Sequence, residues 1–271
     1  MAAVEFVDDE HGGVTVMRDG HPQSHVDPED PGHLVFEYIQ HMAAVIDAAL
    51  PAPGPIGVTH LGGAGLTLPR WVHATRPRSS QIVLEPDETL TTAVRERLPL
   101  PRGHRIRVRP QPGRPGVAAL KDASADVVLV DAFDEGQVPA DLQTVEFFAD
   151  VARVLRPDGL LVMNSPDEPG WRHLSDVVAG ARRSFSPNAA LAVIAMRDVI
   201  KKRRYGNAVL VASRRPVDVD EVRRQVGRWP FPSGVIAGRE LDRRTAGGTP
   251  ITDAESRPSP AAPGPGGWRV R

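Results

Sequence analysis

Apolar and polar residues alternate over residues 4–26, in the three pieces "VEFVDD", "GVTVMRDG" and "HPQSHV". A period of two is typical of half-buried strands, and Asp19-Gly20 between the second and third pieces is a strong hairpin signal. Over residues 33–50 the apolar positions instead recur every three or four residues, which predicts a helix that ends at Pro51. We therefore expect a β-hairpin region followed by a helix.

Beyond Pro55, short apolar runs alternate with helical stretches. The predicted strands are 56–61, 81–85, 105–109, 126–131, 159–164, 190–196 and 208–213. The predicted helices are 66–76, 86–97, 142–155 and 171–184, with a loop-rich stretch from 110 to 120. Near-continuous apolar strands separated by helices indicate a parallel sheet that is covered on both faces. Right-handed crossovers then make this a doubly wound, Rossmann-like α/β fold.

Three regions follow from this pattern. Residues 1–30 are expected to form the N-terminal β-hairpin region, and residues 31–215 the Rossmann-like nucleoside-binding catalytic domain. Residues 216–271 are expected to hold a helix and a Pro/Gly-rich tail. The tail has few apolar residues to bury, so we expect an irregular, solvated segment, with a flap over a site as the alternative.

Composition and charge exclude several classes of partner. A net charge of −1 over 271 residues gives no general attraction for nucleic acid or an anionic membrane, so neither is expected. Cysteine is absent, which excludes thiolate metal ligands and favours a reducing compartment, and the nine histidines lack metal-ligand spacing, so no metal is expected. No apolar run reaches the roughly 18 to 20 residues that span a bilayer, and the acidic N-terminus does not resemble a signal peptide. We therefore expect a cytoplasmic protein.

The stretch "VTHLGGAGLTLPRW" is a strand end, a glycine-rich turn and a helix start. Gly62, Gly63 and Gly65 would let a ligand approach the backbone, although tight strand–helix packing also explains such glycines. The dinucleotide fingerprint needs a further glycine where Leu68 stands, which disfavours NAD. Glu85 ends the next strand at the spacing of a carboxylate that binds ribose hydroxyls, with a helix-start acid as the alternative. Together these features indicate a nucleoside such as the adenosyl part of S-adenosylmethionine.

A pair of aspartates follows the strand within "VVLVDAFDEG". Asp131 and Asp134 are three residues apart in a turn at the same row of strand ends. They could position a cationic amine and accept its proton while the amine attacks a carbon bound to a sulfonium. The alternative is that one of them caps the next helix or loop.

With these residues in place, the sequence resembles the polyamine aminopropyltransferases, the spermidine synthases. The segments that carry the resemblance are "RDGHPQS", "FEYIQHM", "LGGAGLTLPR", "VLEPD" and "DAFDEGQVPADLQTVEFFADVARVLRPDGLLVMN". The resemblance implies a class I S-adenosylmethionine-dependent methyltransferase fold, a homodimer, and an aminopropyl transfer from decarboxylated S-adenosylmethionine to an amine. It further implies that Asp131 accepts the proton, that Asp134 and Glu37 bind the amine, and that Gln23 contacts the donor.

Several positions depart from the family pattern. Pro112 stands where an aspartate would reach the adenine amino group, Ala64 replaces a glycine of the turn, and Val35 and Phe36 replace a tyrosine and a polar residue. Two alternatives therefore stay open. One is a methyltransferase that uses intact S-adenosylmethionine, with Arg70, otherwise a solvated helix residue, as a partner for the donor carboxylate. The other is a non-catalytic nucleoside-binding or assembly protein of the same fold.

Overall fold

The N-terminal residues form a small antiparallel sheet. In the computed structural model, which describes residues 4–50, 52–186 and 188–263, this sheet has the order β1 (Val4–Asp8), β2 (Val14–Arg18), β3 (His21–Val26). Asp19 and Gly20 have positive φ angles of 50° and 76°, as a type I′ turn requires of its two central residues. The predicted hairpin is confirmed, and β1 pairs with β2 on its other side.

The main sheet contains eight strands in the order β11-β9-β10-β8-β7-β4-β5-β6. Their bounds are β4 (Gly57–Leu61), β5 (Ser80–Leu84), β6 (Ile106–Arg109), β7 (Ala125–Val130), β8 (Leu155–Asn164), β9 (Ala190–Met196), β10 (Ala208–Ser213) and β11 (Ser233–Ala237). β4 to β8 pair in parallel, whereas β10 is antiparallel to β8 and β9, and β11 is antiparallel to β9. The predicted Rossmann-like fold is confirmed. It differs from an all-parallel sheet in that the three pairings formed by β9, β10 and β11 are antiparallel.

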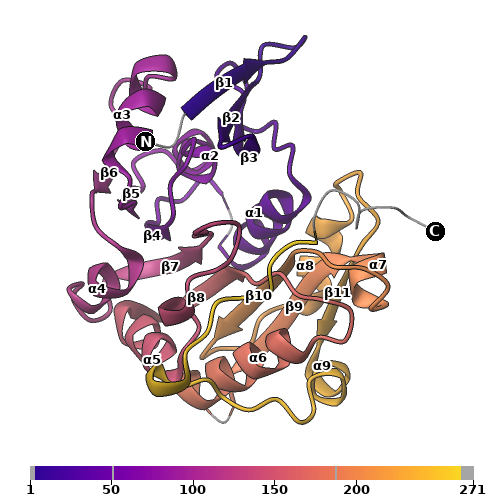
Figure 1. The fold of residues 1–271 in the computed structure, drawn as a ribbon. Coiled ribbons are helices and arrows are strands. Elements are labelled where there is room, and N and C mark those ends of the chain that lie inside the picture. The colour runs from indigo at the N-terminus through magenta and orange to yellow at the C-terminus, as the bar shows by residue number, and fades with distance from the viewer. Residues whose placement is uncertain (1–3, 51, 187, 264–271) are drawn as a thin grey trace.

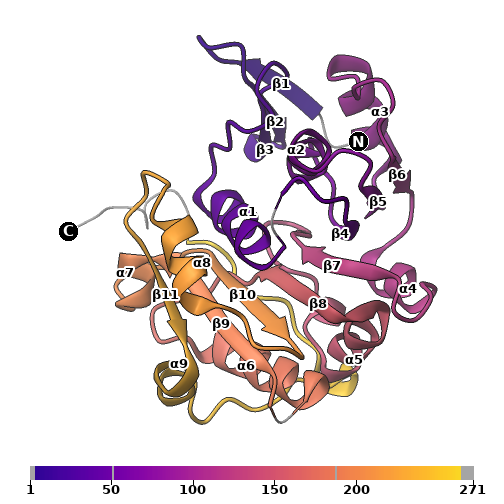
Figure 2. The same cartoon turned by 180° about the vertical axis from the view of Figure 1, so that it is seen from behind.

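Helices cover both faces of this sheet (Figures 1 and 2). One face packs against α1 (Glu37–Ala49), α2 (Thr67–Thr75) and α8 (Val219–Val226). The other packs against α4 (Gly113–Ala118), α5 (Val145–Val154), α6 (Arg172–Phe185), α7 (Arg197–Ile200) and α9 (Gly238–Arg244). α3 (Glu88–Arg97) instead packs against the N-terminal sheet, which it fixes over one end of the main sheet.

Helix starts agree with local capping chemistry. The helix predicted to open at Pro86 begins two residues later, because Asp87 accepts a hydrogen bond from the Leu90 amide at 2.9 Å and acts as the N-cap. Thr144 caps α5 in the same way, accepting from the Phe147 amide at 3.2 Å. A short 3-10 turn, η1 (Ala140–Leu142), precedes this cap.

The structure adds elements that the sequence pattern did not predict. The expected loop 110–120 contains α4, where Pro115 lies in the first helical turn and so removes no helical hydrogen bond. The C-terminal region contains β11 and α9 besides the expected helix, and a 3-10 turn, η2 (Asp253–Glu255). The described part of the tail, to residue 263, is not simply solvated, because Ile251 and Ser259 are fully buried; the prediction for residues 264–271 lies outside the described residues.

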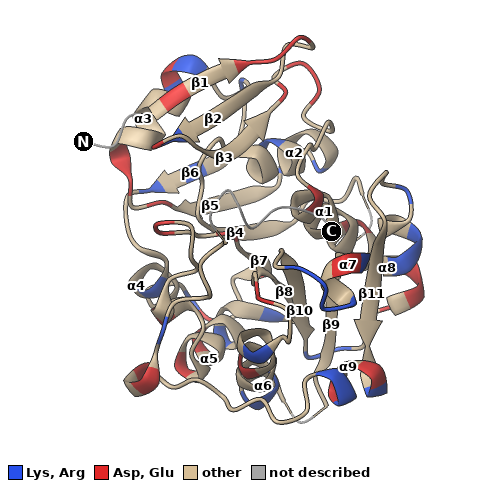
Figure 3. Cartoon of the chain, turned by 45° about the vertical axis from the view of Figure 1, so that its right-hand side comes forward, with Lys and Arg blue, Asp and Glu red and all other residues tan. Residues whose placement is uncertain are grey.

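Residues of both charge signs follow one another along α8 and α9 in Figure 3. This distribution agrees with the near-zero net charge. Within the described residues, none of the helices combines the length and the apolar character that crossing a bilayer requires.

Candidate active site

A cavity of about 790 Å³ opens above the carboxyl ends of β4, β5 and β7, a size typical of small-molecule sites. The N-terminal sheet and the start of α1 form its opposite wall. Of the residues predicted from the sequence, six lie on the wall: Gln23, Gly62, Gly63, Glu85, Asp131 and Asp134. Gly65 and Glu37 lie outside it, and the structure assigns each of them another contact.

The turn after β4 brings its backbone against the end of β7. Gly62 has a φ of +87°, and a Cβ atom there would overlap the carbonyl oxygen of Asp131, so only glycine fits. Ala64 adopts a φ of +37°, the left-handed region that the missing glycine would favour. At Gly65 a Cβ atom would lie 2.8 Å from the Ser24 hydroxyl oxygen. Gly65 therefore serves the packing of the turn against β3.

Glu85 follows β5 and reaches the glycine-rich turn. Its Oε2 accepts a hydrogen bond from the Gly63 amide at 2.8 Å, and its Oε1 accepts one from the Asp87 amide at 3.0 Å. These two backbone donors fix the carboxylate plane, and each oxygen keeps a lone pair for a further donor. Two hydroxyl groups of a sugar are donors of the required kind.

Asp131 is the first residue after β7. Burial raises its pKa from 3.8 to about 6, against the opposing effect of hydrogen bonds from Asn164 and Tyr38. The Asn164 amide nitrogen donates to Asp131 Oδ1 at 3.3 Å. Burial and the charge of Asp131 raise the pKa of Tyr38, so its hydroxyl stays protonated and donates to the carboxylate. Asp131 is therefore ionised at neutral pH, yet it is a stronger proton acceptor than an ordinary carboxylate.

A chain of side-chain hydrogen bonds connects Asp131 to Glu37. Asn164 Nδ2 also lies 3.4 Å from Asn207 Oδ1, and Asn207 Nδ2 donates to Glu37 Oε1 at 3.0 Å. Glu37 therefore lies off the cavity wall. It is connected to Asp131 indirectly, by the hydrogen bonds of Asn207 and Asn164. Neither asparagine was among the site residues predicted from the sequence. The available signal was that Asn164 ends a strand at the same sheet edge as Asp131.

Asp134 lies exposed at the rim of the cavity. Asp134 and Gln137 exchange two backbone hydrogen bonds of 2.9 Å each, and the turn between them uses Glu135 and Gly136 with φ angles of +49° and +78°. This short hairpin turn holds Asp134 in the loop after β7, where it lines the cavity together with Asp131.

The N-terminal sheet supplies polar groups to the opposite wall. Among the described residues, the Gln23 side chain forms its hydrogen bond within its own strand, with Nε2 donating to the His21 carbonyl oxygen at 3.4 Å. His25 Nε2 bonds Asp9 Oδ2 at 2.9 Å, which lowers the pKa of Asp9 to about 2. The buried Nδ1 atom of His25 has no hydrogen-bond partner among the described residues. His25 was not among the site residues predicted from the sequence.

His60 is a second wall residue that the sequence analysis did not identify. Burial lowers its pKa to about 4, so the imidazole is neutral at physiological pH. The amide nitrogen of Gln81 donates to the Pro69 carbonyl, so Gln81 Oε1 is an acceptor, and His60 Nε2 donates to it at 2.9 Å. The pair ties β4 and β5 to α2 beneath the cavity.

Two other residues singled out from the sequence have clear places. Pro112 lies on the cavity wall as the residue before α4. Arg70 is 6% exposed and lies off the wall, and its guanidinium donates to the carbonyl oxygens of Gly65, Pro99 (3.2 Å) and Leu98. The structure supports neither reading of Arg70, since it is neither solvated nor free to bind a donor carboxylate.

The part of the chain that the structure describes contains no cluster of three or more His, Asp or Glu residues that could hold a metal ion. The polar side chains on the cavity wall are carboxylates, hydroxyls, the amide of Gln23, the imidazoles of His25 and His60, and the guanidinium of Arg18. Such a set suits an organic ligand with hydroxyl and amine groups.

The strand order, the glycine-rich turn after β4 and the cavity above the strand ends define a class I methyltransferase fold. The structure of human methyltransferase-like protein 13 in complex with SAH has this fold: it matches with a TM-score of 0.56 and 19% identity over 81% of this chain and 96% of that chain.

Within this fold class, the chain is similar to polyamine aminopropyltransferases. No protein-family model matches it. It is 28% identical to the polyamine aminopropyltransferase of Chromobacterium violaceum over 143 residues, 52% of this chain and 53% of the relative. The chain thus spans about half the length of the curated relatives it matches. A probable spermidine synthase from Corynebacterium glutamicum matches with a TM-score of 0.84 and 28% identity over 93% of both chains. The resemblance noted in the sequence is confirmed.

Proposed function

We propose that the protein is a spermidine synthase-like transferase that moves the aminopropyl group of decarboxylated S-adenosylmethionine to a small amine. One observation carries the proposal: a carboxylate with a raised pKa, Asp131, faces the same cavity as a glycine-rich turn and a sugar-type carboxylate, Glu85. The similarity to polyamine aminopropyltransferases and to a probable spermidine synthase supports the same reaction.

In this proposal the donor nucleoside lies against the turn after β4. Glu85 accepts hydrogen bonds from the ribose hydroxyls with the lone pairs that the Gly63 and Asp87 amides leave free. Gly62 and Gly63 allow the adenosyl group to approach the backbone, and Gln23 contacts the donor from β3. Pro112 contributes apolar contact near the base and, having no side-chain acceptor, leaves the adenine amino group to other partners.

The reaction is one displacement at carbon. The amine nitrogen forms a bond to the carbon beside the sulfonium, the carbon–sulfur bond breaks, and the sulfur keeps the electron pair as a neutral thioether, 5′-methylthioadenosine. The amine has to lose a proton to attack, and Asp131 accepts it. Asp134 at the rim holds the ammonium form of the incoming amine, and Glu37 orients Asp131 through the two asparagines. In-line alignment in the cavity supplies much of the remaining acceleration.

The two alternatives are less well supported. Intact S-adenosylmethionine has a carboxylate that needs a cationic or backbone amide partner near the turn, and the predicted partner, Arg70, is bound to three backbone carbonyls. A non-catalytic protein would not need a proton acceptor with a raised pKa on the wall of a cavity of about 790 Å³. Neither alternative is favoured by the relatives that the chain matches.

Three further predictions accompany this proposal. The homodimer expected from the resemblance remains a prediction, for which the outer strand β1, with Val7 52% exposed, offers a surface. A cytoplasmic location and the absence of nucleic-acid or membrane partners also remain predictions.

The test is a comparison of donors. The purified protein is incubated with putrescine, cadaverine or spermidine and either decarboxylated or intact S-adenosylmethionine, and 5′-methylthioadenosine and S-adenosylhomocysteine are quantified by mass spectrometry. We expect 5′-methylthioadenosine from the decarboxylated donor only. Formation of S-adenosylhomocysteine would instead support the methyltransferase, and failure to bind either donor in a titration would support the non-catalytic protein.

A further inference from the structure

The C-terminal segment follows an unusual course across the molecule. After α9 it passes α6 and α5 and then turns toward the carboxyl ends of the main sheet (Figure 1). We call residues 249–260 the C-terminal strap. It is attached to α6 by the Thr249 amide, which donates to Asp176 Oδ1 at 2.7 Å. It is attached at the start of α5 by the Val145 amide, which donates to the Ile251 carbonyl at 2.8 Å.

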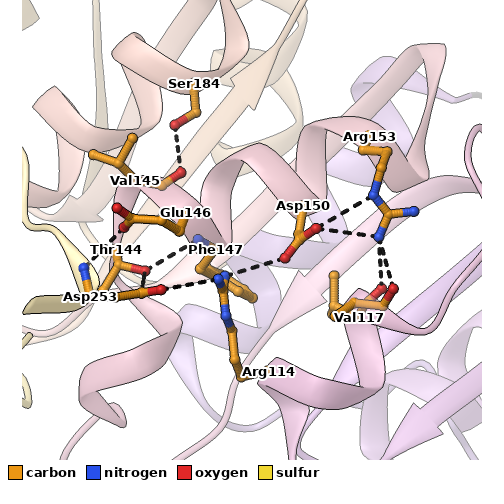
Figure 4. A network of polar contacts seen from close by, with 11 residues as sticks. Arg114, Val117, Thr144, Val145, Glu146, Phe147, Asp150, Arg153, Ser184 and Asp253 are labelled. Atoms are coloured by element: carbon orange, nitrogen blue, oxygen red, sulfur yellow. Dashed lines mark hydrogen bonds and ion pairs between the residues drawn. The ribbon is translucent and has the colours of Figure 1, made fainter.

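A second set of contacts holds the strap at the α5 cap. The Thr144 hydroxyl donates to Asp253 Oδ1 at 2.6 Å, and the Asp253 amide donates to Glu146 Oε2 at 3.0 Å (Figure 4). Arg114 lies between Asp253 and Asp150 and forms an ion pair with each, at 3.4 Å and 3.5 Å. These contacts hold the strap although most of its side chains are polar.

The strap ends on the loop that follows Asp131. Ser259 is fully buried, its hydroxyl accepts a hydrogen bond from the Val138 amide at 2.9 Å, and its own amide donates to the Val138 carbonyl at 3.1 Å. The Gln137 side-chain amide donates to the Ser259 carbonyl. Both polar backbone groups of Val138 are thus satisfied by a residue 121 positions away.

Gln143 fixes the other end of the same loop. Its amide nitrogen donates to the carbonyls of Val138 and Arg257, at 3.2 Å each, so it bridges the loop and the strap. Its Oε1 accepts from His173 Nε2 at 2.5 Å. Burial lowers the pKa of His173 to about 4, so this ring is neutral at physiological pH and the contact does not depend on pH there.

The residues that the strap contacts are close in sequence to residues of the cavity wall. Val138 precedes Pro139, which lines the cavity, and Gln137 exchanges two backbone hydrogen bonds of 2.9 Å with Asp134. The opposite side of the cavity, with Gly63 and Glu85, is held by its own backbone bonds. The strap therefore acts on one side of the cavity, the side of Asp134.

We propose that the C-terminal strap sets the position of the acceptor side of the site, with Ser259 and Gln143 as positioning residues for Asp134 and Pro139. This inference rests on the proposed function, in which Asp134 binds the incoming amine. Loss of the Ser259 contact leaves the buried Val138 amide without an acceptor, which loosens the loop without removing any group that touches a substrate.

The test uses Ser259→Ala in the full chain, with Ser256→Ala, an exposed serine of the same strap, as the matched control. Hydrogen exchange of residues 132–144 is measured by mass spectrometry, together with the KM for the amine and the Kd for 5′-methylthioadenosine. We expect exchange in the loop to become about tenfold faster and the amine KM to rise about tenfold in Ser259→Ala. The Kd for 5′-methylthioadenosine stays within about twofold, and the control matches the wild type.

Each result has one meaning. Unchanged exchange in the loop of Ser259→Ala would overturn the role of the strap. If exchange became faster and the Kd for 5′-methylthioadenosine rose as much as the amine KM, the claim that the strap acts only on the acceptor side would be overturned. If the wild type transfers no aminopropyl group, the proposed function fails, while the exchange and the nucleoside titration still decide the role of the strap. Gln137→Ala removes one strap contact from a partly exposed side chain and is expected to show a smaller effect of the same kind if Ser259→Ala does not fold.

Discussion

The raised pKa of Asp131 has a measurable consequence for stability. Its pKa is about 6 in the folded protein and 3.8 as the reference value, so between these pH values the folded state keeps a proton that the unfolded state has lost. Folding stability therefore falls as pH rises through this window, and the loss is complete above about pH 6. A pKa shift of this size lowers the free energy of unfolding by at most about 3 kcal/mol.

Replacing the carboxylate by an amide removes this loss. In Asp131→Asn the introduced oxygen can accept from Asn164 Nδ2, and the introduced NH2 group can donate to Asn164 Oδ1, a buried atom without a partner among the described residues. Because water reaches part of the Asp131 side chain, we expect a gain of about 1 to 3 kcal/mol above pH 7 and none below pH 4. The same variant should lose aminopropyl transfer, since an amide accepts no proton.

The assay is urea unfolding of the wild type and Asp131→Asn at pH values from 4 to 8, with the difference in unfolding free energy plotted against pH. Asp134→Asn, which changes an exposed aspartate of the same loop, is the control and should show little change. If the difference in unfolding free energy did not depend on pH, or if Asp131→Asn were less stable than the wild type at pH 7.5, the raised pKa of Asp131 would be refuted. Full turnover in that variant would show that another group accepts the proton.

Three more predictions follow from the site. Glu85→Ala should weaken binding of 5′-methylthioadenosine about a hundredfold or more, measured by calorimetry, because two charge-assisted hydrogen bonds are lost; unchanged binding would remove the ribose assignment. The plot of log kcat/KM against pH should fall below about pH 6 as Asp131 becomes protonated, and a flat profile down to pH 5 would contradict its role. Gly62→Ala should destabilise the protein by about 2 kcal/mol more than Gly103→Ala, because both positions have positive φ but only Gly62 faces a backbone carbonyl; equal losses in thermal unfolding would refute the close approach.

Much of the fold could be predicted because its signals are local. The period of the apolar residues separates the parallel strands from their helices, and Asp19-Gly20 marks the hairpin directly. The grouping of site residues on one cavity wall was also predictable, since the carboxyl ends of neighbouring parallel strands share one edge of the sheet. That rule brings Gly62, Glu85 and Asp131 to one cavity although 69 positions separate the first from the last.

The missed features depend on contacts that no local pattern encodes. α4 begins with "GRPG", and glycine and proline are residues that normally argue against a helix. β11 is a strand of only five residues that follows a proline-rich stretch. Arg70 is buried because the carbonyls after α3 fold over it, which its place on α2 does not reveal. Asn207 reaches Asn164 only because β10 pairs antiparallel with β8, in a register that the sequence does not specify.

The two sides of the cavity therefore differ in how the chain encodes them. The contact of Glu85 with Gly63 joins the ends of neighbouring strands over 22 positions, and its contact with Asp87 is local, over 2 positions. The contacts that fix the Asp134 loop come from the strap, 114 to 122 positions further along the chain. Because distant, separately held sites change stability nearly independently, substitutions in the strap should alter the side of the cavity with Asp134 without disturbing the side with Gly63 and Glu85. If the proposed function holds, variation in the strap changes which amine is accepted while the adenosyl site stays constant.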